Sequence, residues 1–165
     1  MSHPSRFRQS LGLAGWLLAS FVTAGVGGIA SSNAAGFYEQ LDRPSWAPPA
    51  WLFGPVWSAL FFLMALSAWL VWRAHGFRGA GTALRLYAAQ LLANALWTWL
   101  FFAWRQGFLA LAEIVVLWLL ITATMWAFWR HSRLATVLLL PYLAWVSFAG
   151  ALNFALWRSN PAALG

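Results

Sequence analysis

Cysteine and lysine are both absent from the 165-residue chain, and only three of its residues are acidic. The lack of cysteine excludes disulfides, thiolate nucleophiles and cysteine metal sites. The lack of lysine excludes a Schiff-base cofactor such as retinal. Charged residues form 8% of the chain, whereas a soluble domain carries roughly 25%. So few charges cannot cover a water-facing surface, and the composition therefore predicts a membrane protein.

Histidine is also scarce, and its positions limit the chemistry. His3, His75 and His131 all fall in predicted tails or loops. We therefore expect no metal site, and no buried histidine pair that could hold haem iron. The only aspartate, Asp42, has no histidine on its predicted side of the membrane, which argues against a Ser-His-Asp triad.

Apolar residues make up 62% of the chain and gather in five long runs. Each run has about the 20 residues that cross hydrocarbon as a helix, and tryptophans at many run ends are typical of an interfacial aromatic belt. We predict an all-α membrane protein, one domain over residues 1–165, built as a five-transmembrane-helix bundle. The predicted helices cover about residues 11–30, 51–72, 86–104, 108–129 and 134–157, with a structured loop over 31–50. A signal peptide is the alternative interpretation of the first run, and the four later runs favour a retained helix.

Arginine supplies all ten basic residues and a net charge of +7. The arginines lie between the apolar runs, so they indicate membrane anchoring and no nucleic-acid partner. The N-terminal side of the predicted bundle carries Arg6, Arg8, Arg73, Arg78, Arg85, Arg130 and Arg133. The other side carries Arg43, Arg105 and Arg158. The positive-inside rule then places the N-terminus in the cytoplasm, with the 31–50 loop outside. We expect the membrane to be a bacterial cell membrane.

The segment from Tyr38 to Trp57 has the most unusual composition in the chain. Its sequence, YEQLDRPSWAPPAWLFGPVW, holds four of the seven prolines and three of the fourteen tryptophans. Proline fixes φ and removes a backbone donor, so this segment cannot be one continuous helix. We expect a structured, aromatic-rich loop that runs into a helix near Pro55.

Polar and aromatic residues at helical spacing mark two candidate faces. Gln90, Asn94 and Trp97 share a face of the third predicted helix. Such residues point into the bundle, where hydrogen bonds between helices and contact with a ligand are equally good interpretations. Trp57 and Phe61 share a face of the second helix, a pattern more typical of packing than of binding.

The fifth predicted helix carries Tyr142, Trp145 and the small Ala149 on one face, after an expected kink at Pro141. Packing against another helix is the simpler explanation of this face. Glu113 is the one acidic residue inside a predicted span. With no partner identified, we interpret it as a protonated or hydrogen-bonded group near a helix start instead of a functional carboxylate.

These residues resemble the tryptophan-rich sensory protein / translocator protein family, also called peripheral benzodiazepine receptors. The resemblance covers nearly the whole chain, from the first predicted helix to Arg158. Three segments carry it: Tyr38…Leu41…Pro44-Ser45-Trp46…Pro48-Pro49…Trp51…Phe53…Pro55…Trp57, Gln90-Leu91…Asn94…Trp97…Phe101-Phe102, and Pro141-Tyr142-Leu143-Ala144-Trp145…Leu152-Asn153…Trp157-Arg158.

The resemblance implies a five-helix bundle, often a homodimer, with a ligand pocket beneath the first loop. The implied ligands are porphyrins, including haem, and no cofactor is required. With Trp51 and Phe61 added from the loop and the second helix, the expected ligand-binding residues are Tyr38, Trp46, Trp51, Trp57, Phe61, Asn94, Trp97, Tyr142, Trp145 and Ala149. The loop would be a lid that holds Trp46 and Trp51 over the pocket. Arg43, Arg105 and Arg158 are candidates to pair with porphyrin carboxylates.

One difference from the family's sequence pattern concerns the binding of lipids. The family's sterol-recognition segment needs a tyrosine between an apolar and a basic residue, and Phe154 stands at that position here, before Arg158. This difference weakens the case for tight binding of cholesterol-like lipids, although contact with membrane lipid itself is expected.

Three functions are compatible with the sequence. The first is a membrane-embedded sensor or regulator that binds tetrapyrroles. The second is light-dependent degradation of porphyrin, for which the resemblance implicates Trp57 and Trp145 as the only candidate catalytic residues, since no acid–base constellation is present. The third is a transporter of porphyrins or sterol-like lipids, which the absence of an internal repeat makes less favourable.

Overall fold

The computed structural model describes residues 6–165, and this part of the chain is made of helices and loops with no β-strand. The all-helical prediction is therefore confirmed. In chain order the elements are α1 (Arg6–Ala30), α2 (Ala34–Glu39), the 3₁₀ turn η1 (Ala50–Leu52), α3 (Phe53–Thr98), the π-helical turn η2 (Trp99–Ala103), α4 (Gly107–Trp129), α5 (Arg133–Leu138), α6 (Leu140–Ser159) and α7 (Pro161–Leu164).

Four helical stretches among the described residues are long and apolar enough to cross a membrane. They are Arg6–Ala30, Ala50–Ala103, Gly107–Trp129 and Arg133–Ser159. Large apolar side chains such as Leu18, Leu92 and Trp126 are more than 60% exposed. Apolar side chains facing outwards are expected where the surroundings are lipid tails.

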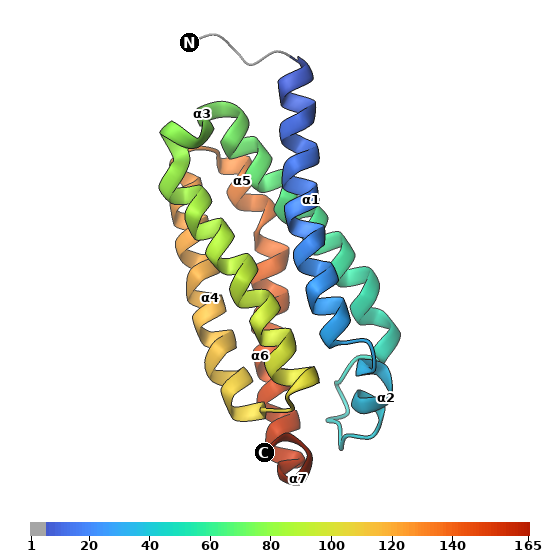
Figure 1. Ribbon diagram of the computed structural model, residues 1–165. Coiled ribbons are helices and arrows are strands. Elements are labelled where there is room, and N and C mark those ends of the chain that lie inside the picture. Colours follow the sequence, from blue (N-terminus) through green and yellow to red (C-terminus); the bar gives the residue numbers. More distant parts are fainter. Residues whose placement is uncertain (1–5) are drawn as a thin grey trace.

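The longest stretch folds back on itself inside α3. A straight helix of the 54 residues Ala50–Ala103 would be about 80 Å long, far more than the roughly 30 Å of bilayer hydrocarbon. The helical geometry breaks at Gly76 (φ 61°, ψ −174°) and Ala80. Figure 1 shows α3 reversing its direction there, so that its first arm (53–75) and second arm (81–98) run in opposite directions.

Neighbouring helices are joined by hydrogen bonds as well as by apolar packing. The buried hydroxyls of Ser20 in α1 and Tyr87 in the second arm lie 2.7 Å apart. Ser67 of the first arm donates to the carbonyl of Ala135 in α5 at 2.6 Å. Since lipid offers no competing water, such bonds hold helices together within a membrane. They attach α1 to the second arm of α3 and α5 to the first arm.

The turn between α3 and α4 is tight, and it brings α4 against the end of α6. Arg105 has a positive φ of 54°, and the next helix begins at Gly107. A Cβ atom at Gly107 would lie 2.7 Å from Cδ1 of Trp157. Only glycine lets the start of α4 approach α6 this closely, and the backbone carbonyl of Gly107 accepts a hydrogen bond from Asn153 of α6 at 3.0 Å.

The fifth predicted run, 134–157, is divided into α5 and α6. The interruption falls at Leu139, and Pro141 occupies the first turn of α6. Proline lacks the N–H that would continue the helical ladder, but it is well suited to a first turn. The kink expected from Pro141 therefore appears as a helix boundary.

The backbone at Gly76 leads to a test of the bend. Its φ of 61° with an extended ψ is a region that residues with a Cβ atom avoid, and occupying it costs about 1–3 kcal/mol. Gly76→Ala should lower the thermal denaturation midpoint in detergent micelles. Gly81→Ala is the matched control, because a Cβ there meets no atom within 4 Å and φ is not positive. Equal midpoints for the two variants would contradict the strained geometry.

Candidate ligand cavity

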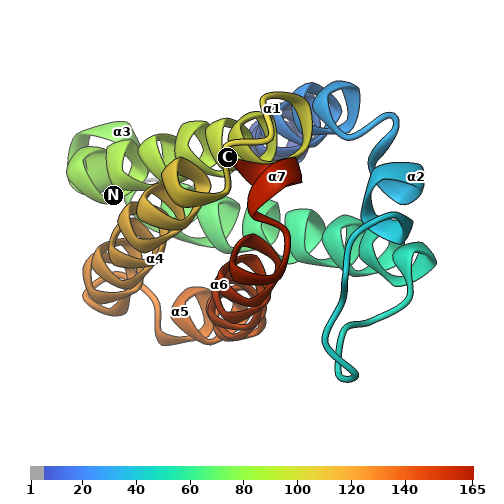
Figure 2. The same ribbon diagram turned by 90° about the horizontal axis from the view of Figure 1, so that it is seen from below.

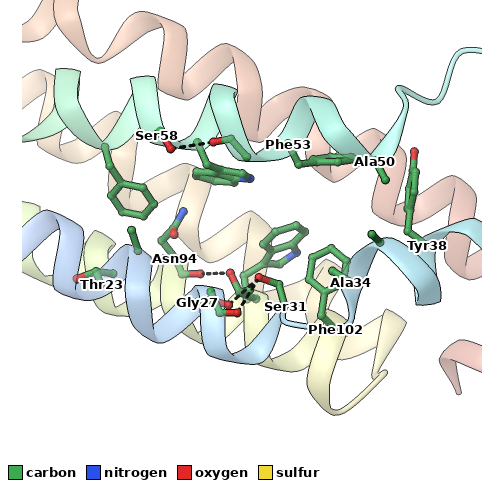
Figure 3. A pocket seen from close by; sticks show the side chains of 18 of the residues that line it. Thr23, Gly27, Ser31, Ala34, Tyr38, Ala50, Phe53, Ser58, Asn94 and Phe102 are labelled. Carbon is green, nitrogen blue, oxygen red and sulfur yellow. Dashed lines mark hydrogen bonds between the residues drawn. The ribbon is translucent and has the colours of Figure 1, made fainter.

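A cavity of about 400 Å³ lies between α1, α2 and the two arms of α3. Ligand pockets typically measure roughly 300–1,000 Å³, so this one has room for a small molecule. In Figure 3 it separates Thr23, Gly27 and Ser31 of α1 from Phe53 and Ser58 of α3. The lining residues are Phe21, Thr23, Ala24, Gly27, Gly28, Ser31, Ala34, Ala35, Tyr38, Ala50, Phe53, Gly54, Trp57, Ser58, Phe61, Asn94, Trp97, Thr98 and Phe102.

Small residues of α1 create the space on one side. Ala24, Gly27 and Gly28 all line the cavity. A Cβ atom added to Gly28 would meet nothing within 4 Å, and one added to Gly27 would meet only Thr98, at 3.4 Å or more. The helix therefore presents bare backbone to the cavity where larger side chains would fill it.

The opposite wall is held in place by Tyr142, which is fully buried in α6. The Asn94 amide donates to the Tyr142 hydroxyl at 3.1 Å. The ring of Trp57 meets the ring of Tyr142 edge to face, with centroids 6.2 Å apart, and contacts Phe61 at 5.8 Å. One buried tyrosine thus positions both an amide and an indole that face the cavity.

Trp97 completes the aromatic lining of the second arm. Its indole N–H donates to Oδ1 of Asn153 in α6 at 3.1 Å, and its ring stacks on Phe101. Asn153 in turn donates to the carbonyl of Gly107. This chain of hydrogen bonds fixes the orientation of the Trp97 ring, because buried polar groups that all have partners have little freedom to move.

The hydroxyl groups around the cavity are already engaged within their own helices. Ser31 donates to the carbonyl of Gly27 at 2.9 Å, and Ser58 donates to that of Gly54 at the same distance. Thr98 donates to the carbonyl of Asn94 at 3.1 Å. Their donors are therefore satisfied, and the walls act as a mainly apolar and aromatic surface toward a ligand.

Tyr38 of α2 closes the end of the cavity nearest the loop. Its hydroxyl donates to the carbonyl of Pro48 at 2.9 Å, and the Arg43 guanidinium lies over its ring at 5.0 Å. Burial raises the pKa of Tyr38 above its usual value and outweighs the opposite effect of Arg43. The hydroxyl therefore stays protonated near neutral pH and keeps this bond. Arg105 lies over the neighbouring Phe37 ring at 4.7 Å.

The segment after α2 is attached to α6 in two ways. The backbone N–H of Asp42 donates to Oδ1 of Asn160 at 2.8 Å, and Nδ2 of Asn160 donates to the carbonyl of Asp42 at 3.0 Å. The ring of Trp46 meets that of Phe148 at 5.8 Å. Figure 2 shows α2 and the extended chain that follows it next to the start of α3, and Figure 1 shows α2 and α7 at the same end of the bundle.

The structure brings half of the predicted binding residues to the cavity. Those that line it are Tyr38, Trp57, Phe61, Asn94 and Trp97. Those that do not line it are Trp46, Trp51, Tyr142, Trp145 and Ala149. Within the second group, Trp51 is 71% exposed and Trp46 is 50% exposed, whereas Tyr142 and Ala149 are buried. Trp145 contacts Phe53, a lining residue, edge to face at 5.9 Å.

The contribution of α1 is the part that our sequence analysis missed. Ala24 and Gly28 have the spacing of a small-x-x-x-small pattern, which usually indicates a surface for close helix approach. In the structure the same two residues border open space. The pattern alone could not separate these outcomes, because a small residue permits either a close neighbour or a gap.

Three side chains carry buried polar atoms that have no hydrogen-bond partner among the described residues: Gln90, Glu113 and Trp145, the last at its indole nitrogen. Neither amide atom of Gln90 hydrogen-bonds to any of the described residues, although the side chain is fully buried. Oε2 of Glu113 likewise has no hydrogen-bond partner among residues 6–165, and the residue is 9% exposed. Asn94 and Trp97 share a helix face with Gln90. Both form hydrogen bonds to side chains of α6, whereas Gln90 does not.

Within residues 6–165, no three histidine or acidic side chains come close enough to hold a metal ion. His75 and His131 do meet, with ring centroids 4.6 Å apart, at the end of the bundle far from the cavity. His3 lies outside the described residues. The cavity therefore offers aromatic rings and amides to a ligand, and its described lining residues include no histidine or carboxylate.

Comparison with known proteins identifies the family of this chain. A sequence model of the TspO/MBR family matches residues 14–158. The chain belongs to the TspO/MBR family. A tryptophan-rich sensory protein from Cereibacter sphaeroides is 45% identical over 124 residues, which cover 75% of this chain and 77% of the relative. A translocator protein from Sus scrofa is 39% identical over 140 residues, or 81% and 83% of the two chains.

TspO/MBR membership and the four apolar helical stretches together identify an integral membrane protein. The family predicted from the sequence motifs is confirmed. A third relative, Protein CrtK of Rhodobacter capsulatus, is 41% identical over 126 residues, which cover 76% of this chain and 79% of the relative.

The Tyr38 hydroxyl gives a test of how the loop is held. Tyr38→Phe removes the bond to Pro48, which contributes about 0.5–1.5 kcal/mol. Amide exchange over residues 40–49, followed by mass spectrometry, should become about two- to tenfold faster. Tyr87→Phe makes the same change far from the loop, at the bond to Ser20. Loop exchange that is unchanged in Tyr38→Phe, or equally faster in both variants, would show that this bond does not hold the loop.

Proposed function

We propose that this protein is a membrane-embedded sensor or regulator that binds tetrapyrroles such as protoporphyrin or haem. The observation that carries the proposal is the cavity of about 400 Å³, walled by Trp57, Phe61, Trp97 and Tyr38 with Asn94 between them. Flat aromatic ligands suit such walls, because stacked and edge-to-face contacts add to the gain from burying apolar surface.

Arginines near the loop end supply the complementary charge. Arg43 and Arg105 lie over the rings of Tyr38 and Phe37, at the end of the cavity that Tyr38 closes. A tetrapyrrole with its ring among the aromatic side chains would extend its carboxylates toward these guanidinium groups, which bind carboxylates with two parallel hydrogen bonds. Such binding needs no metal ligand from the protein.

The same proposal includes the membrane arrangement. Each arm of α3 would cross the bilayer once, which with α1, α4 and the α5–α6 pair makes five crossings. The arginine distribution supports a cytoplasmic N-terminus, with α2 and the loop outside and acting as a lid over the cavity. A homodimer in a bacterial cell membrane, as the family resemblance implies, completes the proposal.

Filling the cavity tests the ligand site. Ala24→Phe places a ring in the cavity, and it should weaken protoporphyrin binding by at least about tenfold through steric exclusion. The measurement is quenching of tryptophan fluorescence in the purified protein. Val22→Phe is the matched control, because Val22 lies on the same helix, is 56% exposed and does not line the cavity. An unchanged affinity in Ala24→Phe, with the fold intact by circular dichroism, would place the ligand elsewhere.

The orientation in the membrane can be tested by cysteine labelling. The chain has no native cysteine, so an introduced cysteine is its only thiol. Ser45→Cys lies in the loop after α2, and Ala74→Cys lies at the α3 bend; both positions are exposed. With a membrane-impermeant maleimide applied to intact cells, Ser45→Cys should be labelled and Ala74→Cys should react only after the cells are broken. The opposite pattern would invert the proposed orientation, and labelling of both in intact cells would rule out the bend and the loop being on opposite sides.

A further inference from the structure

A cluster of basic side chains occupies the end of the bundle opposite the cavity. The α3 bend contributes Arg73 and His75, and the turn between α4 and α5 contributes Arg130, His131 and Arg133. The rings of His75 and His131 meet edge to face at 4.6 Å and so join the two turns. We call these five residues the histidine–arginine cluster. All three arginines are exposed, and no part of the cavity touches them.

The three arginines of the cluster share one local arrangement. Each lies four residues after a tryptophan and places its guanidinium over that indole ring. The pairs are Arg73 on Trp69 at 4.4 Å, Arg130 on Trp126 at 4.1 Å and Arg133 on Trp129 at 5.3 Å. Trp126 and Trp129 are 65% and 52% exposed. Tryptophan favours the level of lipid headgroups, so these contacts hold the positive charges at that level.

Among residues 6–165, no acidic side chain lies at this end of the bundle. Four further arginines, Arg6, Arg8, Arg78 and Arg85, belong to the same end of the chain's fold. The acidic residues lie elsewhere: Glu39 and Asp42 are in and beside α2, and Glu113 is in the second turn of α4, whose start is at the opposite end. Figure 1 shows the α3 bend and the start of α1 together at the top, away from α2.

We propose that the histidine–arginine cluster is a binding site for the phosphate headgroup of an anionic phospholipid such as phosphatidylglycerol. Guanidinium groups bind phosphate oxygens with charge-assisted hydrogen bonds. The indole rings beneath them and the exposed apolar side chains of α4 lie where acyl chains would continue from the headgroup. A free phosphate would meet the same arginines but would gain nothing from those apolar surfaces, which is why the site favours a lipid.

The position of His131 beside His75 and Arg130 makes this site sensitive to pH. His131 faces His75 from α3 and Arg130 from its own turn, and burial together with these two groups lowers its pKa below the usual value. A bound phosphate opposes the two positive neighbours and raises the proton affinity of His131. By linkage, lowering the pH adds protons and strengthens phosphate binding. The affinity should therefore rise as pH falls from about 8 to about 5.5.

The test uses the full-length protein in phosphatidylcholine vesicles that contain a spin-labelled lipid, with the immobilised fraction read by electron spin resonance. Spin-labelled phosphatidylglycerol should associate more strongly than spin-labelled phosphatidylcholine. Arg130→Gln/Arg133→Gln should reduce the preference by roughly fivefold for each arginine removed. Arg158→Gln removes one positive charge at the opposite end and should leave the preference unchanged, without the roughly fivefold loss expected for one arginine of the cluster. Thermal denaturation confirms that the variants fold.

Two further measurements distinguish this lipid site from general charge attraction and from a site for free phosphate. His75→Gln/His131→Gln should keep the preference for phosphatidylglycerol at about pH 8 but abolish its increase at about pH 5.5. Inorganic phosphate at an equal concentration should not displace the labelled lipid. An equal loss in Arg158→Gln, displacement by inorganic phosphate, or no preference for phosphatidylglycerol in the unmodified protein would each overturn the proposal.

Discussion

The hydrogen bond between Asn94 and Tyr142 is the contact on which the cavity depends most directly. It joins the second arm of α3 to α6 inside the bundle, where an amide without a partner would cost about 1–3 kcal/mol. The same tyrosine ring supports Trp57 from the other arm. One fully buried side chain therefore keeps the two arms of α3 at a fixed separation, and the space left between them and α1 is the cavity. If the arms closed on each other, the cavity would be lost although every helix remained.

The features that depend on local residue patterns could be predicted from the sequence alone. Apolar run lengths predicted helices, because a bilayer requires each run to satisfy its own backbone. The polar face of Gln90, Asn94 and Trp97 was predictable from helical spacing, and all three side chains are buried. The sequence could not show that Asn94 and Trp97 find partners in α6 while Gln90 does not. That difference depends on the rotation of one helix against another, which no local pattern encodes.

The least predictable features depend on distant segments. The small residues of α1 were compatible with a tight helix contact or with a gap, and only the position of α3 decides between them. The contact of His75 with His131 joins two turns that lie 56 residues apart in the chain. Trp46 and Trp51 were both expected over the pocket, yet Trp46 meets Phe148 and Trp51 is exposed. Proline and tryptophan content predicts an ordered loop without giving the direction in which each ring points.

The reciprocal pair of hydrogen bonds between Asp42 and Asn160 has a mechanical consequence. It connects positions 118 residues apart, so the segment after α2 is attached to the residue that follows α6. A force or a bulky attachment at the C-terminus is therefore transmitted to the segment beside the cavity through Asn160. We therefore expect a bulky group attached at the C-terminus to disturb the segment beside the cavity more than a change at the start of α1, which lies at the other end of the bundle.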